Sequence, residues 1–231
     1  MKNSHMIITI DGPAGVGKST LAGRLAESFK IAYLDTGAMY RAVGWMLGNE
    51  DPDSDQNKLG KILEGLIFGL HGSGWNSRVT LNKNILGDEI RTEEAGMRAS
   101  DFARLKIVRE YLTKSQQNIG QETSLVAEGR DMGSVVFINA HYKFFLDASA
   151  RVRAERRQAQ LLRMRKQADY SLILEQIIKR DEQDRNRAIA PLKPAPDAIV
   201  IDTGPMNPDQ VFEQMTKHIE NSPIRSKSSY K

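Results

Sequence analysis

The stretch Gly12-Pro13-Ala14-Gly15-Val16-Gly17-Lys18-Ser19 decides the fold, because it follows the pattern G-x-x-x-x-G-K-[ST] of a phosphate-binding loop. Its glycines let successive backbone N–H groups point at one anion. The apolar run Met6–Ile10 predicts a buried strand before the loop, and Ser19–Lys30 has the spacing of a helix that presents its N-terminus to the same phosphates. Lys18 can then reach the β- and γ-phosphates, and the Ser19 hydroxyl can bind Mg²⁺. The pattern predicts a nucleoside triphosphate and magnesium, but not the reaction.

Outward from the loop, short apolar runs alternate with helical stretches. We expect further strands at Ile31–Leu34, Ser124–Ala127, Lys143–Leu146 and Ala198–Ile201. We expect helices from Thr36 onward and at Lys58–Leu70, Glu93–Arg98, Asp101–Asn118, Ala150–Lys166, Leu172–Arg187 and Pro208–Ile219. Five strands that alternate with helices predict an α/β fold with a parallel sheet and right-handed crossovers. Arg78–Asp88 instead has the alternation of a small β-hairpin, which suggests a lobe inserted into the parallel core.

The composition excludes several classes of protein. The chain has 231 residues and no cysteine, which excludes a disulfide framework, a thiolate zinc site and a cysteine nucleophile. With 40% hydrophobic and 27% charged residues it can bury the core of one large domain. No apolar run approaches the roughly 20 residues of a membrane-spanning helix, and the run after Lys2 is too short for a signal-peptide core. These features predict a cytoplasmic protein.

The positive charge is concentrated in one segment. The net charge is +4, and residues 151–187 alone hold 11 Lys/Arg and 6 Asp/Glu. Like charges at this density repel one another unless an anion gathers them. A lid that closes over polyphosphate would explain the segment, and so would RNA binding. Tyr170 is the single aromatic residue there, and unspecific RNA binding usually needs several to stack on bases, so the composition favours polyphosphate.

Polar residues follow two of the predicted strands, where ligands bind in open α/β folds. After the second strand, Thr36 is expected to cap a helix and Arg41 to project from its first turns, with a solvated Arg41 as the less favoured alternative. After the strand predicted at Ser124–Ala127, Glu128 occupies the place of a carboxylate that holds magnesium waters. Arg130 and Asp131 follow Gly129, where they either face the cleft or form a surface pair.

Arg180, Asp184 and Arg187 are spaced four and three residues apart and share one face of a helix. Two guanidinium groups beside a carboxylate can bind a phosphate and a ribose hydroxyl together. The same spacing is also typical of a solvated stripe of ion pairs, and the spacing alone does not decide between the two.

Taken together, these segments resemble the bacterial cytidylate kinase family, whose members transfer a phosphoryl group from ATP to CMP or dCMP. The resemblance runs from Ile8 to about Ile219 and rests on residues 8–20, 34–41, 129–137, 145–149 and 180–192, which include Leu-Asp-Thr-Gly-Ala-Met-Tyr-Arg, Gly-Arg-Asp-Met-Gly-Ser-Val-Val-Phe and Arg-Asp-Glu-Gln-Asp-Arg-Asn-Arg-Ala-Ile-Ala-Pro-Leu. It implies a nucleoside monophosphate kinase fold with a five-stranded parallel sheet. It also implies a monophosphate-binding lobe with a small antiparallel β insert at 36–105, a helical lid at 150–168 and a disordered tail at 222–231.

The resemblance also implies roles for individual residues. The implied ATP-binding residues are Gly12, Pro13, Ala14, Gly15, Val16, Gly17, Lys18, Ser19 and Thr20. The implied CMP-binding residues are Thr36, Tyr40, Arg41, Ser100, Arg109, Arg130, Asp131, Arg180, Asp184 and Arg187. The implied catalytic residues are Lys18, Arg130, Arg187, Arg156 and Arg157, with Arg153 as a further lid arginine. Ser19 would bind Mg²⁺ directly and Glu128 through water, although members of the family often carry Asp at the latter position.

The implied base site agrees with the chemistry of cytosine. Cytosine offers an N4 amino donor that Asp131 can accept, whereas its O2 and N3 acceptors suit Arg109 and the Ser100 hydroxyl. Uracil would place a carbonyl against the carboxylate, and such a mismatch costs about 1–3 kcal/mol, or at least about tenfold in specificity. The remaining alternatives are a kinase of another small acceptor, such as UMP and CMP jointly, dTMP or shikimate, and an RNA-binding module. We expect ATP with Mg²⁺ and CMP or dCMP as partners, no nucleic acid, no membrane, and a monomer.

Overall fold

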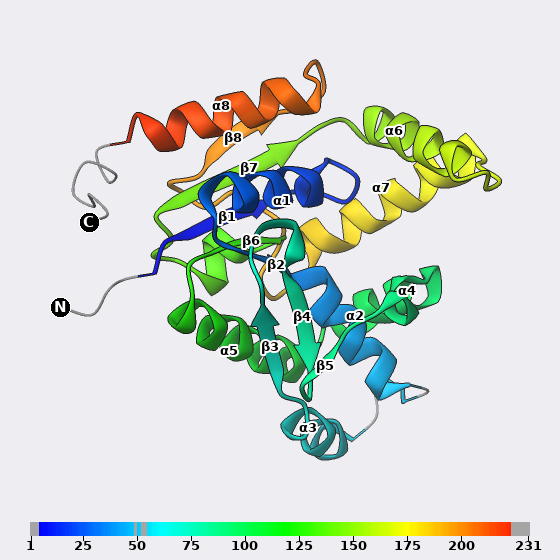
Figure 1. Cartoon of the computed structure of the whole chain (residues 1–231). Helices are drawn as coiled ribbons and strands as arrows, with labels where there is room; N and C mark the ends of the chain where they lie inside the picture. The colour runs from blue at the N-terminus through cyan, green and yellow to red at the C-terminus, as the bar shows by residue number, and fades with distance from the viewer. Residues whose placement is uncertain (1–4, 49, 52–54, 223–231) are drawn as a thin grey trace.

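A parallel sheet with the strand order β2-β6-β1-β7-β8 forms the centre of the protein (Figure 1). The structure is a computed structural model and describes residues 5–48, 50–51 and 55–222. The strands are β1 (Ile7–Asp11), β2 (Ala32–Asp35), β6 (Leu125–Gly129), β7 (Tyr142–Asp147) and β8 (Ile199–Asp202). Each begins and ends within two residues of its predicted range, so the expected five-stranded parallel core is confirmed.

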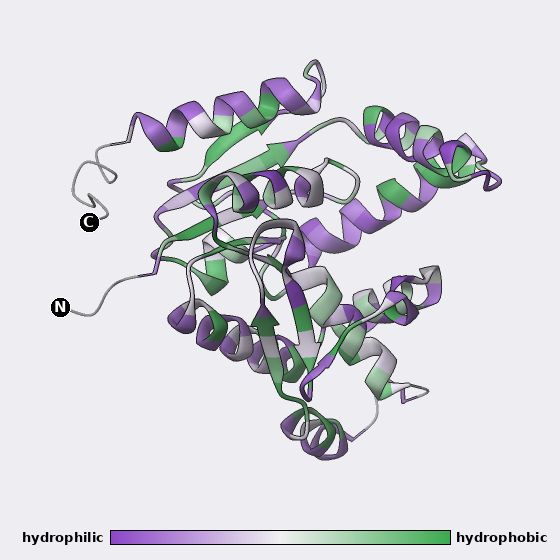
Figure 2. Ribbon diagram, viewed as in Figure 1, coloured by the Kyte–Doolittle hydropathy of each residue, from purple (hydrophilic) through white to green (hydrophobic). Residues whose placement is uncertain are grey.

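Helices cover both faces of this sheet. The side chains of a strand alternate between the two faces, so Ile8 and Ile10 of β1 face one core and Ile7 the other. Helices α1 (Lys18–Phe29) and α8 (Pro208–Glu220) cover the first face. The second lies under α2 (Thr36–Leu47), α3 (Gln56–Glu64) and α5 (Lys106–Glu122). Figure 2 shows green and purple residues along α5 and α8, as expected for helices with one buried face.

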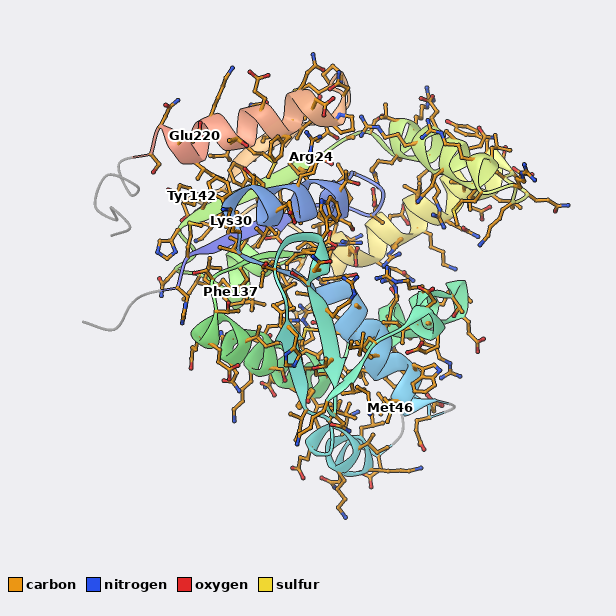
Figure 3. The ribbon with its side chains drawn as sticks, viewed as in Figure 1. Arg24, Lys30, Met46, Phe137, Tyr142 and Glu220 are labelled. Carbon is orange, nitrogen blue, oxygen red and sulfur yellow. The ribbon has the colours of Figure 1, made fainter. Side chains whose placement is uncertain are left out.

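Helices α1 and α8 are joined by an ion pair at the rim of their core. Arg24 of α1, labelled in Figure 3, places its Nη1 atom 2.7 Å from Oδ1 of Asp209. The same guanidinium group lies 4.3 Å from the centre of the Phe212 ring on α8. This contact fixes α8 against the helix that follows the phosphate loop.

A small antiparallel sheet with the order β3-β4-β5 forms the insert. Its strands are β3 (Phe68–His71), β4 (Arg78–Leu81) and β5 (Asn84–Ile85), and the expected hairpin is the β4–β5 pair. Asn82 and Lys83 form its turn with φ angles of 50° and 69°, as the favoured two-residue hairpin turn requires. The helix expected over Lys58–Leu70 is wrong beyond Glu64, because Gly65 caps α3 and the next residues pair with β4.

The insert is anchored on the helix of the phosphate loop. The short turn η1 (Gly74–Asn76) between β3 and β4 places the Trp75 ring where a side chain of Gly23 on α1 would lie. The backbone N–H of Trp75 donates to Oε2 of Glu27, which is also on α1, at 3.1 Å. The small sheet therefore contacts the core of the fold at one end.

Two helix pairs complete the fold. Helix α4 (Glu93–Phe102) follows the short turn η2 (Asp88–Arg91) and packs on α2, while α6 (Ala150–Arg163) packs on α7 (Tyr170–Asn186). The pair α6–α7 has a small apolar core of its own around Ala154, Ile173 and Ile177. Residues 52–54, and residues 223–231 of the predicted tail, lie outside the described residues. No described helix is long and apolar enough to cross a membrane.

Candidate active site

The phosphate loop lies between β1 and α1, as predicted. Gly12 has a φ angle of 146°, and a Cβ atom there would lie 2.1 Å from the Leu146 carbonyl oxygen, so only glycine fits. The Nζ atom of the buried Lys18 donates to the carbonyl oxygens of Gly12, at 2.9 Å, and Pro13, at 2.7 Å. No side chain caps α1, whose N-cap is Gly17. The first N–H groups of α1 and the Lys18 ammonium group thus converge on this loop, which is the geometry of an anion site.

Ser19 and Glu128 lie in contact beside the loop. The Ser19 hydroxyl donates to Oε2 of Glu128 at 3.0 Å, and the Tyr33 hydroxyl contacts the other carboxylate oxygen. Burial and the nearby Asp35 raise the pKa of Glu128, while Lys18 opposes the shift. Burial, followed by the charge of Arg130, lowers the pKa of Lys18. A serine hydroxyl beside one buried carboxylate suits Mg²⁺, which takes one or two protein ligands together with substrate phosphates and water.

A second cluster surrounds Asp131, which follows the end of β6. Nη2 of Arg109, on α5, contacts Oδ2 of this buried carboxylate, and Nη2 of Arg187 lies 3.9 Å from Oδ1. The Arg109 guanidinium group also lies 5.7 Å from the centre of the Tyr40 ring on α2. Three separate segments therefore hold one carboxylate between two guanidinium groups and an aromatic ring.

Asp184 of α7 joins this cluster. Its Oδ2 atom accepts from Nε of Arg130 at 2.8 Å, and its Oδ1 lies 3.7 Å from Nη1 of Arg187. Burial alone would raise the pKa of Asp184, but the charge of Arg130 and its hydrogen bond lower it. Asp184 and Arg187 thus form one side of a partly buried ion network with Arg130, which excludes a fully solvated helix stripe.

Arginines gather beside this network with few counter-charges. Burial, and after it the positive charge of Arg130, lowers the pKa of Arg180 to about 10, and Arg41 of α2 adds to the effect. Among the described residues, Nε of Arg180 and Nη2 of Arg187 are buried side-chain nitrogens without a hydrogen-bond partner. Unpaired donors on buried cations are costly unless an anion completes them, so the cluster fits a phosphate group.

Thr36 does not take its expected position as a helix cap. The cap of α2 is Asp35 and not Thr36, because the Asp35 carboxylate accepts from the Ala38 N–H at 3.0 Å. The Thr36 hydroxyl instead donates to the Glu128 carbonyl oxygen at 2.6 Å. Ser100 lies half-buried on α4 and forms no hydrogen bond with Arg109 or Asp131 in the described part of the chain.

In the described part of the chain, no hydrogen bond joins Arg156 or Arg157 to the phosphate loop. Arg156 donates to the hydroxyl of Thr203, at 3.0 Å, and to its carbonyl oxygen, in the loop between β8 and α8. Arg157 pairs with Gln160 on its own helix, at 2.8 Å. Arg153 is the lid arginine that contacts the loop, since its Nη1 donates to the Ala14 carbonyl oxygen at 3.1 Å.

Three residues of the site carried little signal in the sequence. Along β2, Leu34 is buried, whereas Tyr33 and Asp35 share the opposite, half-buried face. This alternation could have revealed Tyr33 as a residue near the site. Asp11 lies immediately before Gly12 and accepts two backbone N–H groups from the segment after Asp131. Asp181 pairs with Arg153, but in the sequence it is indistinguishable from the other charged residues of α7.

A parallel α/β sheet with a phosphate loop and a cationic second site at the same strand ends defines a phosphotransferase of the phosphate-loop class. The family model described as "Cytidylate kinase" matches residues 8–221. The chain belongs to the cytidylate kinase family.

Curated relatives agree with this family over nearly the whole chain. A cytidylate kinase of Maridesulfovibrio salexigens is 56% identical over 218 residues, which cover 94% of this chain and 98% of the relative. One of Nitratidesulfovibrio vulgaris is 52% identical and covers 93% of each chain. One of Thermosipho melanesiensis is 44% identical and covers 92% of this chain and 96% of the relative. The resemblance seen in the sequence is confirmed.

Proposed function

We propose that this protein transfers the γ-phosphoryl group of ATP to CMP or dCMP and releases ADP with CDP or dCDP. One observation carries the choice of acceptor: the Asp131 carboxylate is held by Arg109 beside the Tyr40 ring, and near it Arg180 and Arg187 each have a buried nitrogen without a hydrogen-bond partner among the described residues. A carboxylate accepts from the N4 amino group of cytosine but opposes the O4 carbonyl of uracil. The relatives named cytidylate kinase support the same choice.

The acceptor phosphate is proposed to bind Arg41, Arg130 and Arg187, while Arg180 and Asp184 bind the ribose. In addition to burial, the positive charges of Arg130 and Arg41 both lower the pKa of Arg180, which supports the placement of these arginines around one site. Thr36 and Tyr40 would line the same site from α2, and Ser100 would need to approach Asp131 as the lobe closes. We propose residues 36–105 as this monophosphate-binding lobe.

ATP is proposed to bind residues 12–20, with its β- and γ-phosphates at Lys18 and its magnesium ion at Ser19. Mg²⁺, when bound, neutralises charge on the phosphate oxygens. Glu128 would accept hydrogen bonds from water on that ion, and Tyr33 fixes the orientation of its carboxylate. The lid at 150–168 would bring Arg157 to the phosphates. Arg156 would need to leave its Thr203 contacts to join it.

The acceptor phosphate oxygen is already an anion at neutral pH, so the transfer needs no general base. The residues contribute position and charge: Lys18 at the transferred group, Arg130 and Arg187 at the acceptor, and a closed lid that excludes water. When the new P–O bond forms, the bond to the β-phosphate oxygen breaks, and the leaving oxygen keeps the electron pair. A monomer located in the cytoplasm stays a prediction.

A coupled assay of ADP formation with CMP, dCMP, UMP, AMP, GMP, dTMP and shikimate tests the proposal. CMP and dCMP should be the preferred acceptors, and faster turnover of any other acceptor would overturn the choice. The Lys18→Ala variant should lose at least about 100-fold in kcat, as for other groups that stabilise transferred charge. The exposed Lys217→Ala on α8 is the matched control and should keep the normal rate.

A further inference from the structure

Asp11 connects the phosphate loop to the segment that carries Arg130 and Asp131. It is the last residue of β1, stands directly before Gly12, and is only 4% exposed. Its Oδ1 atom accepts the Met132 N–H and its Oδ2 atom the Gly133 N–H, each at 2.8 Å. Two consecutive backbone N–H groups in the segment after β6 thus donate to the two oxygens of one buried carboxylate.

These two N–H groups belong to the first turn of a rare element. Residues Met132–Val136 form a π-helical turn, η3, whose N-cap is Asp131. The first N–H groups of a helical turn have no partner within it, and an Asp at the N-cap usually accepts one with its own side chain. Asp131 makes no such bond, because its carboxylate faces Arg109. Asp11 performs the capping from β1 in its place.

The close approach of this segment to β1 has a second cause. A Cβ atom on Gly133 would lie 2.9 Å from Oγ1 of Thr9 and 3.2 Å from the Lys143 side chain. Only a glycine therefore allows the backbone to come within hydrogen-bond distance of Asp11. The β1–β6 register supports the same placement, with Asp11 opposite Gly129.

We propose that Asp11 is a positioning residue for recognition of the acceptor base. By capping η3 it leaves the Asp131 carboxylate free to face Arg109, Arg187 and the base. Without it, the unpaired N–H groups would draw the Asp131 carboxylate back to the cap position. The inference rests on the proposed function, which places the base at Asp131.

Asp11→Asn tests this inference, because the amide keeps the size of the side chain but offers only one acceptor oxygen. The readout is the ratio of kcat/KM for CMP to that for UMP at fixed ATP, in which effects on ATP binding cancel. The ratio should fall at least about fivefold with a raised KM for CMP, which corresponds to about one lost buried hydrogen bond. Ile8→Val, on the opposite face of β1, is the control and should leave the ratio unchanged.

Two further variants separate the outcomes. If Asp131→Asn leaves the CMP/UMP ratio unchanged, the proposed base site itself is wrong. If Asp131→Asn lowers the ratio and Asp11→Asn does not, only the role of Asp11 is overturned. The double variant should show no lower ratio than Asp131→Asn alone, and additive losses would contradict an action through Asp131. If Asp11→Asn fails to fold, Gly133→Ala is used instead, because it disturbs the contact between Asp11 and η3 from the other side. Gly133→Ala should lower the CMP/UMP ratio. An unchanged ratio would overturn the inference.

Discussion

Arg153 of α6, the helix of the proposed lid, and Asp181 of α7 form a two-pronged ion pair at the edge of the phosphate loop. Nη1 of Arg153 lies 2.9 Å from Oδ1 of Asp181, and its Nη2 contacts Oδ2. The same guanidinium group donates to the carbonyl oxygens of Ala14 and Ala148 and is only 2% exposed. The loop, the lid and the helix that carries Asp184 and Arg187 therefore meet at one buried charge.

Removal of one partner of this pair should be costly. Asp181→Ala leaves the buried Arg153 without its carboxylate, and we expect a loss of about 3 kcal/mol in the free energy of unfolding, as for other broken buried pairs. Urea unfolding measures it. The control is Arg185→Ala on the same helix, whose 3.6 Å pair with Asp147 is exposed and should be worth at most about 0.5 kcal/mol. Equal losses in the free energy of unfolding for Asp181→Ala and Arg185→Ala would contradict a special cost of leaving the buried Arg153 without its carboxylate.

The contact between Trp75 and Gly23 predicts a second stability effect. A Cβ atom on Gly23 would lie 2.3 Å from the Trp75 ring, so Gly23→Ala should displace the insert from α1 and cost about 1–3 kcal/mol. Gly96→Ala on α4 meets no atom within 4 Å and should instead stabilise the protein by about 0.5–1 kcal/mol. Urea unfolding curves compare the two variants. A neutral or stabilising Gly23→Ala would contradict the described docking of the insert.

Asp11 predicts a pH dependence of stability. Burial raises the pKa of Asp11 from 3.8 to about 6 in the folded protein. The charge of Asp131 raises this pKa further, whereas the two backbone hydrogen bonds and the charge of Lys18 lower it. A raised folded pKa means that protonation stabilises the folded state, and this contribution is complete below pH 3.8 and is lost as the pH rises through 6. The wild type should therefore gain about 1 kcal/mol per pH unit over Asp11→Asn as the pH falls below 6. A constant difference between pH 8 and pH 5 in urea unfolding would contradict the burial of this carboxylate.

The pair of Ser19 and Glu128 predicts the magnesium dependence of the rate. Glu128→Gln removes the charge that faces the proposed ion, so the Mg²⁺ concentration for half-maximal rate should rise on the order of tenfold. Tyr33→Phe, which only frees the carboxylate to rotate, should give a smaller rise. Glu213→Gln on α8 is the matched control, since Glu213 is exposed and, among the residues that the structure describes, pairs with the exposed Lys217 alone. A titration with Mg²⁺ at saturating CMP measures the effect, and overlapping curves for Glu128→Gln and wild type would contradict the assignment.

The sequence predicts the fold well where local signals are strong. The phosphate loop and the five apolar runs identify the parallel sheet, because buried parallel strands are continuously hydrophobic. The error at Lys58–Leu70 arose because Ile67, Phe68 and Leu70 fit a helical spacing as well as a strand. Only the pairing of β3 with β4, which begins between Phe68 and Leu81, thirteen residues apart in the chain, decides for the strand.

The sequence predicts several residues of the site, but it does not predict which residues contact one another. Ion pairs join Arg109, Arg130, Asp131, Asp184 and Arg187, and all of these except Arg109 lie in the motif segments 129–137 and 180–192. Asp11 and Asp181 act through partners more than twenty residues away, which spacing along the chain does not reveal. Arg153, Arg156 and Arg157 lie on one helix, and their different partners depend on how that helix is packed.

The central claim is that Asp131 selects cytosine at the acceptor site. The most direct test is a competition in one tube, with equal CMP and UMP at limiting concentration, ATP and Mg²⁺, and separation of CDP from UDP at early times. The wild type should form CDP over UDP by at least about tenfold, the equivalent of one mismatched polar contact. Asp131→Asn should bring the two products close to equal amounts. Equal products from the wild type, or an unchanged preference in Asp131→Asn, would contradict the account.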